Sequence, residues 1–197
     1  VGDLPNVEIV PGDALRLDLE GLIAEKFQGL TPMVCANLPY NITTPVLTKL
    51  AGIPSLTALT VLIQKEAAQR FTAPQGSPEI AAFPLQLQYR METELLFDVE
   101  PECFLPRPKV TSTVLRCVRR QQPAVAVRDE ALFQKVLKGA FLLRRKTLSN
   151  SLASALPQFS KEEIQAAIAE CGLPATVRGE ALSLAEFAAL TEALAKG

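Results

Sequence analysis

The segment Asn37–Tyr40 combines groups that could hold a flat, nitrogen-rich ligand. Asn37 offers an amide oxygen that accepts hydrogen bonds and an amide nitrogen that donates them, and Tyr40 offers a ring on which a base can stack. The apolar run Met33–Ala36 predicts a buried strand just before, which Pro39 prevents from continuing as a paired strand. Ligands of open α/β sheets bind at the carboxyl ends of strands. We therefore expect a binding site here; the alternative is a loop in which Asn37 caps a turn and Tyr40 packs on the surface.

Composition excludes several other kinds of chemistry. The chain has no histidine, which excludes Ser-His and Cys-His nucleophilic catalysis. A zinc site needs clustered Cys or His ligands, and a disulfide framework is typical of short secreted chains. We therefore expect free thiols, no metal and a cytoplasmic location, because the four cysteines are scattered: Cys35, Cys103, Cys117 and Cys171.

Charge is distributed unevenly although the net charge is only −1. Residues 1–106 hold 6 Lys and Arg against 13 Asp and Glu, residues 107–150 hold 11 against 2, and residues 151–197 hold 3 against 6. A basic block inside an acidic chain indicates a localised contact with a polyanion. The alternative is a solvated helix face. No apolar run approaches the roughly 18 residues that a membrane helix needs, so we expect no membrane contact.

The elements that must position these groups alternate along the first part of the chain. Hydrophobic patterns predict strands over 7–10, 33–36, 56–63, 92–99 and 112–119, and helices over 19–27, 44–50, 65–71 and 80–91. Thr44 is a plausible cap for the second helix, with Pro45 in its first turn. Strands alternating with helices predict a doubly wound sheet, and the last two strands, which no helix separates, predict an antiparallel pair at its edge.

Strand patterns end at Arg128, and the rest of the chain has helical spacing. Apolar residues recur at helical intervals over 132–148, 164–168 and 184–194, and Ser160 with Glu163 predicts a capped helix start. The segment 121–124 is the expected linker. We therefore expect an α/β domain over residues 1–122 and an all-α domain over residues 123–197.

Five motifs in a fixed order carry a resemblance to a known family. The stretch Asn37–Pro45, which reads NLPYNITTP, resembles motif IV of the N6-adenine methyltransferases. With the other four motifs, it resembles the KsgA/RsmA family of small-subunit rRNA adenine dimethyltransferases. These motifs lie at Gly12–Leu15, Val61–Glu66, Phe104–Val110 and Phe141–Leu152. One departure is that the glycine-rich cofactor loop, which the family carries upstream, is absent from this chain.

The resemblance implies a fold and a cofactor. It implies a Rossmann-like sheet that binds S-adenosylmethionine, N-terminally incomplete here, followed by a helical rRNA-binding domain. Asp13 is expected to bind the adenine amino group of S-adenosylmethionine, with the Ala14 backbone reading the ring and Asn37 also beside the cofactor. The alternative for Asp13 is a turn cap after a strand. Each strand–helix unit spans on the order of 30 residues, so we expect roughly 60 or more residues before Val1 in the natural protein. They should include the glycine-rich loop and an acidic ribose ligand.

The resemblance also implies how the motif acts. The exocyclic amine of adenine is a poor nucleophile because its lone pair is delocalised into the ring. The Asn37 side-chain oxygen and the Leu38 carbonyl are expected to accept its two N–H groups, and Pro39 fixes where that carbonyl points. Tyr40 is expected to stack on the flipped base, which is worth roughly 1–3 kcal/mol. No strong general base is needed, because the methylated, cationic nitrogen is acidic.

Other residues receive roles from the same resemblance. Phe104 is expected to be a second wall for the target base, with a core phenylalanine as the alternative. Arg107 and Lys109 flank prolines in an extended loop and are expected to contact phosphates. Arg144, Arg145 and Lys146 are consecutive, so on a helix they would fan over about 200° and bind the RNA backbone.

The expected function is dimethylation of the N6 amines of two adjacent adenosines near the 3′ end of 16S rRNA, in small-subunit biogenesis. S-adenosylmethionine is the expected cofactor, the immature small subunit the partner, and the protein a monomer; this fragment alone is expected to be inactive. One alternative is an Erm-type 23S rRNA adenine methyltransferase, and another is a non-catalytic rRNA-binding assembly factor.

Overall fold

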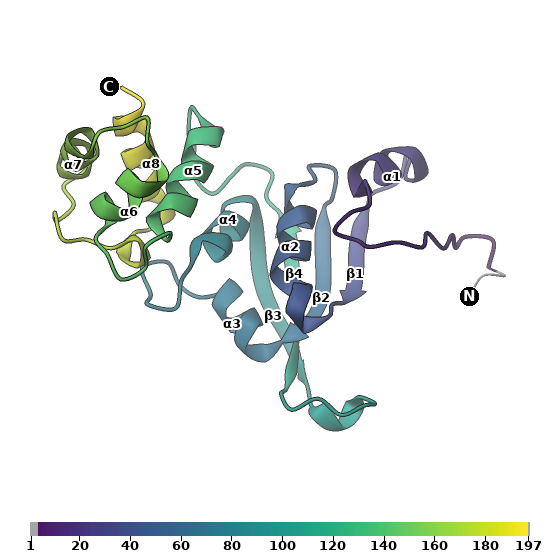
Figure 1. Cartoon of the computed structure of the whole chain (residues 1–197). Coiled ribbons are helices and arrows are strands. Elements are labelled where there is room, and N and C mark those ends of the chain that lie inside the picture. The colour runs from purple at the N-terminus through teal and green to yellow at the C-terminus, as the bar shows by residue number, and fades with distance from the viewer. Residues whose placement is uncertain (1–3, 197) are drawn as a thin grey trace.

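The computed structural model describes residues 4–196, and its centre is a four-stranded mixed sheet (Figure 1). The strands are β1 (Met33–Asn37), β2 (Ala58–Gln64), β3 (Met91–Val99) and β4 (Ser112–Arg119), in the spatial order β1-β2-β4-β3. β1 and β2 are parallel, whereas β4 is antiparallel to both β2 and β3. The predicted antiparallel pair at the edge is confirmed, because β3 and β4 follow each other without a crossover helix.

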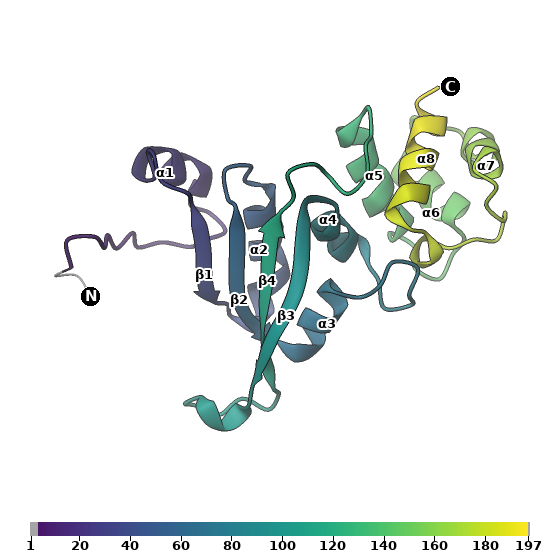
Figure 2. The same ribbon diagram turned by 180° about the vertical axis from the view of Figure 1, so that it is seen from behind.

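Helices α2 (Thr43–Gly52), α3 (Lys65–Phe71) and α4 (Ala82–Arg90) lie on one face of this sheet, and Figure 2 shows the opposite face in front. Alternate residues of β2 point to the helices: Leu59, Val61 and Ile63 are fully buried, and their neighbours are half-buried. Within the part of the chain described, a doubly wound arrangement is therefore not formed.

The strand that carries the motif is more exposed than its sequence predicts. β1 is an edge strand, paired only with β2, and α1 (Leu19–Lys26) lies at the end of the sheet beside it (Figures 1 and 2). Met33 is 62% exposed and no β1 side chain is buried. The prediction of a buried strand over Met33–Ala36 was thus right about the strand and wrong about its burial, because burial needs neighbours that an apolar run does not specify.

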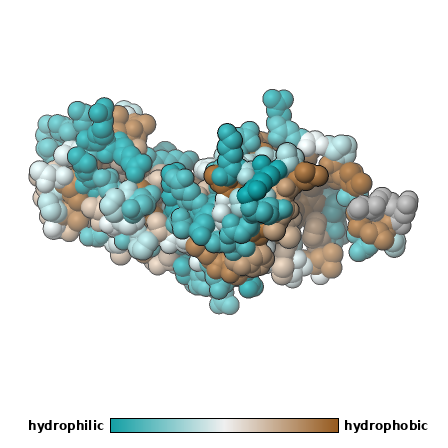
Figure 3. All heavy atoms as spheres, turned by 90° about the horizontal axis from the view of Figure 1, so that it is seen from below, coloured by the Kyte–Doolittle hydropathy of each residue, from teal (hydrophilic) through white to brown (hydrophobic). Residues whose placement is uncertain are grey.

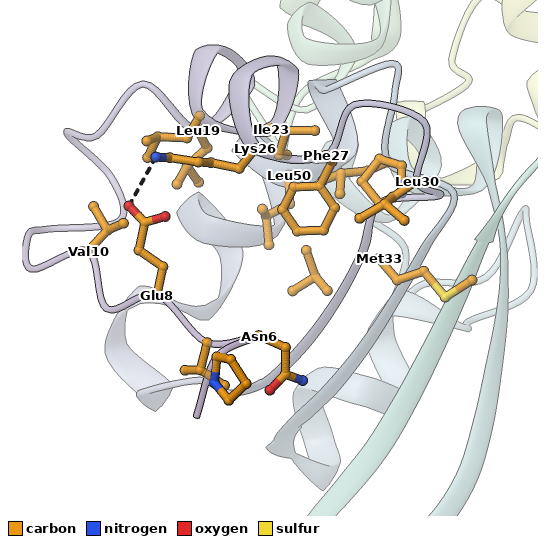
Figure 4. Close-up of a pocket in the computed structure, with 16 residues that line it drawn as sticks. Asn6, Glu8, Val10, Leu19, Ile23, Lys26, Phe27, Leu30, Met33 and Leu50 are labelled. Carbon is orange, nitrogen blue, oxygen red and sulfur yellow. Dashed lines mark ion pairs between the residues drawn. The ribbon is translucent and has the colours of Figure 1, made fainter. Parts of the chain in front are cut away.

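The predicted strand over 7–10 is absent, and these residues are exposed coil. Val7, Val10, Met33 and Val34 line a groove of about 920 Å³, in which Val10 and Met33 lie on opposite sides (Figure 4). The backbone of 7–10 therefore lies across a gap from β1 and cannot form a ladder with it. Seen from below, hydrophobic residues gather around a hollow on this N-terminal side of the sheet (Figure 3).

The C-terminal part is helical: α5 (Glu130–Ala140), α6 (Leu148–Ala155), α7 (Lys161–Glu170) and α8 (Leu184–Leu194). Ser160 and Glu163 form the predicted capping box, and Ser183 with Glu186 forms a second one. These helices share one hydrophobic cluster, and the sheet with α2 and α3 holds another. α4 joins the two clusters, since Leu85 and Tyr89 belong to the first and Leu87 to the second.

Two local predictions were wrong. Ile42, not Thr44, is at the N-cap of α2, and no side chain caps it; the Thr43 hydroxyl instead donates to the Pro39 carbonyl at 3.2 Å. Residues 141–147 form turns rather than a helix, so Arg144, Arg145 and Lys146 do not fan around a helix axis. α5 ends at Ala140 because the next segment makes a tertiary contact: the Leu143 N–H donates to Ser151 Oγ at 2.9 Å.

Candidate active site

The motif turns sharply at the carboxyl end of β1. Asn37 is the last residue of the strand, and the Leu38 N–H still donates to the Leu62 carbonyl of β2 at 3.1 Å. Pro39 then ends the pairing, a short 3-10 helix covers Tyr40–Ile42, and α2 begins at once. Within residues 4–196, neither the Asn37 side chain nor the Leu38 carbonyl oxygen takes part in a hydrogen bond. Both predicted acceptors therefore remain free for a ligand.

Tyr40 is held in place by a contact that joins distant strands. Its hydroxyl lies 2.8 Å from Ser112 Oγ, at the start of β4, and Ser112 is fully buried. A hydrogen bond to a buried group restricts how the ring can turn. Tyr40 itself is half-buried, so one side of it stays accessible. Ser112 was not among the predicted site residues, because no local pattern connects positions 72 residues apart.

A cavity of about 300 Å³ brings the motif together with the loop between β3 and β4. Asn37, Leu38, Pro39 and Tyr40 line one part of it, and Phe104, Pro106 and Pro108 line the rest. Phe104 is half-buried and belongs to neither hydrophobic cluster. The structure thus places Phe104 at the motif rather than in the core.

Asp13 and Ala14 lie in a separate exposed turn and do not line this cavity. Asp13 Oδ1 accepts the Leu15 N–H at 2.9 Å, and Asp13 Oδ2 lies 3.6 Å from Arg16 Nε. The carboxylate therefore caps its own turn. It still has acceptor capacity, because an ionised carboxylate has about four lone-pair sites.

The predicted RNA-binding residues lie in two places. Arg107 and Lys109 are exposed in the loop that projects from the β3–β4 hairpin (Figure 1), where Arg107 forms an ion pair with Glu102. Arg144–Lys146 are exposed in the turns between α5 and α6, and Arg144 donates to the Pro78 carbonyl at 3.0 Å. Both groups are available to a polyanion, but they do not form one continuous cluster with each other.

Lys65 has a structural contact. Lys65 Nζ lies 2.5 Å from Asp98 Oδ2, and the Thr113 hydroxyl donates to Asp98 Oδ1 at 2.6 Å. The hydrogen bond from Lys65, and then that from Thr113, lower the pKa of Asp98, and the same carboxylate raises the pKa of Lys65. This network ties the start of α3 to β3 and β4 next to the hairpin loop.

A groove of about 920 Å³, larger than the cavity at Asn37, lies beside β1 and away from the motif. α1, the segment 5–10 and β1 line it with mostly apolar side chains, and one ion pair crosses it, from Lys26 Nζ to Glu8 Oε1 at 3.1 Å (Figure 4). It contains none of the predicted site residues, so we assign the chemistry to the smaller cavity at Asn37.

Solved structures support the fold. A dimethyladenosine transferase from Plasmodium falciparum superposes with a TM-score of 0.73 at 20% identity, covering 96% of this chain and 72% of that one. The 23S rRNA methyltransferase ErmE superposes with a TM-score of 0.63 at 22% identity, covering 97% and 73%. The predicted Rossmann-like methyltransferase fold with an added helical part is confirmed.

No helix within residues 4–196 has the length and apolar character that would let it cross a membrane.

Curated relatives extend the comparison. Ribosomal RNA small subunit methyltransferase A of Geobacillus sp. (strain WCH70) is 40% identical, covering 96% of this chain and 66% of the relative. The protein of that name from Streptococcus gordonii is 44% identical, covering 98% and 68%. The chain thus spans about two thirds of the length of these relatives. The family model described as "Ribosomal RNA adenine dimethylase" matches residues 3–196, and the chain belongs to that family.

Proposed function

We propose that this protein transfers methyl groups from S-adenosylmethionine to the N6 amines of two adjacent adenosines near the 3′ end of 16S rRNA during small-subunit biogenesis. The observation that carries this proposal is the cavity at the end of β1. There the free Asn37 amide and the free Leu38 carbonyl lie beside the rings of Tyr40 and Phe104. Two acceptors and two aromatic rings suit a flat base with one exocyclic NH₂ group.

In this proposal Asn37 Oδ1 and the Leu38 carbonyl accept the two N–H groups of the target amine in the first transfer, and one of the two acceptors takes the single remaining N–H in the second. Holding both hydrogens favours a tetrahedral nitrogen and directs its lone pair away from the ring. Pro39 limits the backbone freedom of the Leu38 carbonyl. Preorganised acceptors of this kind favour the transition state, because they need no rearrangement as charge develops on nitrogen. After transfer, the cationic nitrogen loses a proton to water, so no histidine is required.

The rings orient the base. Tyr40 stacks on it, with its hydroxyl held by Ser112, and Phe104 closes the other side from the hairpin loop. Aromatic–base stacking contributes roughly 1–3 kcal/mol per base.

S-adenosylmethionine supplies a methyl group activated on a sulfonium sulfur. The chain's own residues fit it in part: the Asp13 carboxylate is exposed and retains free acceptor sites for an adenine amino group, with the Ala14 backbone beside it, and the Asn37 side chain makes no hydrogen bond within residues 4–196. We propose that these three residues bind the cofactor.

The helical domain, residues 123–197, and the hairpin loop are proposed to bind the rRNA backbone. Arg107 and Lys109 lie in the β3–β4 loop, next to the cavity-lining residues Pro106 and Pro108, and Arg144, Arg145 and Lys146 lie at the α5–α6 turns. Phosphate contacts of this type fix the position of an RNA without reading its sequence.

A labelled methyl-transfer assay tests the function. The intact protein with labelled S-adenosylmethionine is expected to label immature small subunits and not large-subunit RNA. Labelling of large-subunit RNA instead would assign it to the Erm type. Tight binding to small subunits without labelling would make it a non-catalytic assembly factor.

A further inference from the structure

Lys49 makes contacts that the proposed mechanism does not use. It lies in the last turn of α2, and its ammonium group donates to three main-chain carbonyls: those of Ala14 at 3.0 Å, Leu15 at 2.9 Å and Leu17 at 2.5 Å. A lysine ammonium has three donors, so all of them are used. The ion pairs within residues 4–196 include none with Lys49. An ordinary surface lysine would instead keep its charged head in water.

Three N–H groups of the turn are satisfied within the turn itself. The Asp13 carbonyl accepts the N–H groups of Arg16 and Leu17, both at 2.9 Å, and the Asp13 side chain accepts that of Leu15. Lys49 adds donors to three further carbonyls, of which the Leu17 carbonyl also accepts the Leu19 N–H at 3.0 Å. Hydrogen bonds from a charged donor are stronger than neutral ones. Leu15 of this turn packs against the hydrophobic cluster of the sheet, Leu17 is half-buried, and the other residues of the turn are exposed, so apolar packing holds only part of it.

α2 connects this contact to the catalytic motif. The helix begins directly after the 3-10 helix Tyr40–Ile42, and its Thr43 hydroxyl donates to the Pro39 carbonyl. Lys49 lies six residues further, about 9 Å along the axis at 1.5 Å per residue. The motif that would hold the target base thus lies at one end of α2. Near the other end, the Lys49 ammonium donates hydrogen bonds to the turn that contains Asp13 and Ala14.

We propose that Lys49 is a positioning residue that fixes the turn 13–17 on α2 and thereby sets Asp13 and Ala14 relative to Asn37. That this turn binds S-adenosylmethionine rests on the proposed function; the anchoring of the turn does not. Removing the ammonium frees the turn to move, so cofactor affinity falls while the chemistry at Asn37 is preserved. A residue with a purely global structural role would lower stability and activity together.

The test compares Lys49→Met, which keeps the chain length and removes the donors, with Lys161→Met, which replaces an exposed lysine at the start of α7 outside the basic block 107–150. In the intact protein, Lys49→Met is expected to raise the KM for S-adenosylmethionine at least about tenfold and to leave kcat at saturating cofactor within about twofold. Lys161→Met should change neither. An unchanged KM in Lys49→Met, or a loss confined to kcat, would overturn the proposal.

Limited trypsin digestion tests the anchoring without any cofactor. Arg16 lies in the turn with its side chain 90% exposed, and Arg128, 89% exposed, is the internal reference. Cleavage follows the population of locally opened chain. Lys49→Met should speed cleavage after Arg16 at least about fivefold relative to cleavage after Arg128. If the ratio of cleavage after Arg16 to cleavage after Arg128 is the same in Lys49→Met as in wild type, the proposal is overturned, even when both rates rise. If wild type fails to bind S-adenosylmethionine, the cofactor role of the turn fails, and digestion alone decides the role of Lys49.

Discussion

At the scale of single residues, the proposed methyl transfer depends on the free acceptors at the end of β1. Asn37 is exposed, makes no hydrogen bond within the described chain, and lines the same cavity as Tyr40 and Phe104. An exposed amide without a structural partner contributes little to stability. Its proposed contribution is therefore to the reaction and not to the fold.

Replacing Asn37 with Ala should lower methyl transfer at least about 100-fold, comparable to the loss of a preorganised transition-state contact. The free energy of unfolding should change by less than about 0.5 kcal/mol. Asn41→Ala, an exposed asparagine in the same segment, is the matched control and should retain activity. Near-normal turnover in Asn37→Ala would remove this residue from the chemistry.

The cysteines give a chemical test of the fold itself. Burial raises the pKa of the Cys117 thiol to about 12, whereas Cys35 and Cys103 are exposed. At pH 8, which lies far below that pKa, only on the order of one Cys117 in ten thousand is a thiolate, and the thiolate is the reactive form. Iodoacetamide at pH 8 should therefore alkylate Cys35 and Cys103 and spare Cys117 until the protein unfolds. Labelling of native Cys117 at the rate of Cys35 would contradict the placement of β4 in the core.

At the scale of elements, the helical part contains a close approach that only glycine allows. A Cβ atom on Gly179 would lie 2.7 Å from the Ala140 carbonyl oxygen at the end of α5. Gly52, at the end of α2, has open space where its Cβ would be. These two positions make a matched pair of substitutions.

Gly179→Ala should destabilise the protein by about 1–3 kcal/mol, because the backbone must move to admit the methyl group. Gly52→Ala should be neutral or stabilising by up to about 1 kcal/mol, since it only removes freedom from the unfolded chain. Denaturant unfolding of both variants measures the difference. Equal effects of the two substitutions would show that α5 and the Gly179 segment do not approach as described.

Helices and strands also show which parts of the fold could be predicted from sequence. The capped helix at Ser160 and the strand Met33–Asn37 follow from local patterns, and the structure has both. The segment 7–10 has a strand pattern but faces a groove, and a strand exists only with a partner. Residues 141–147 have helical spacing, but the Leu143 N–H donates to Ser151 Oγ instead of continuing the hydrogen-bond pattern of α5. These failures arise from long-range contacts, as do the unpredicted roles of Ser112 and Lys49.

At the scale of the whole molecule, charge is the feature to test. Residues 107–150 carry 11 basic against 2 acidic residues, while the rest of the chain is acidic. Each phosphate that Lys or Arg neutralises releases counterions, so affinity falls linearly with the logarithm of salt concentration. Both basic groups of the proposed site lie in this block.

Changing Arg144, Arg145 and Lys146 together to Ala should weaken binding to an rRNA fragment and flatten the salt slope by about one unit per lost contact. A control with the same change of charge replaces the three basic residues of 151–197, Lys161, Arg178 and Lys196. It should leave the slope unchanged. Equal slopes for wild type and the first variant would make 144–146 a solvated surface. The RNA would then be held elsewhere, with Arg107, Lys109, Arg116 and Arg119 as the next candidates.

The most direct measurement of the central claim is nucleoside mass spectrometry of small-subunit rRNA after incubation with the intact protein and S-adenosylmethionine. N6,N6-dimethyladenosine is expected at two adjacent positions near the 3′ end with the wild-type protein. With Asn37→Ala this modified nucleoside should be lost. Unmethylated RNA, or methyl groups on other nucleosides, would contradict the assignment of the cavity at Asn37 to adenine N6 dimethylation.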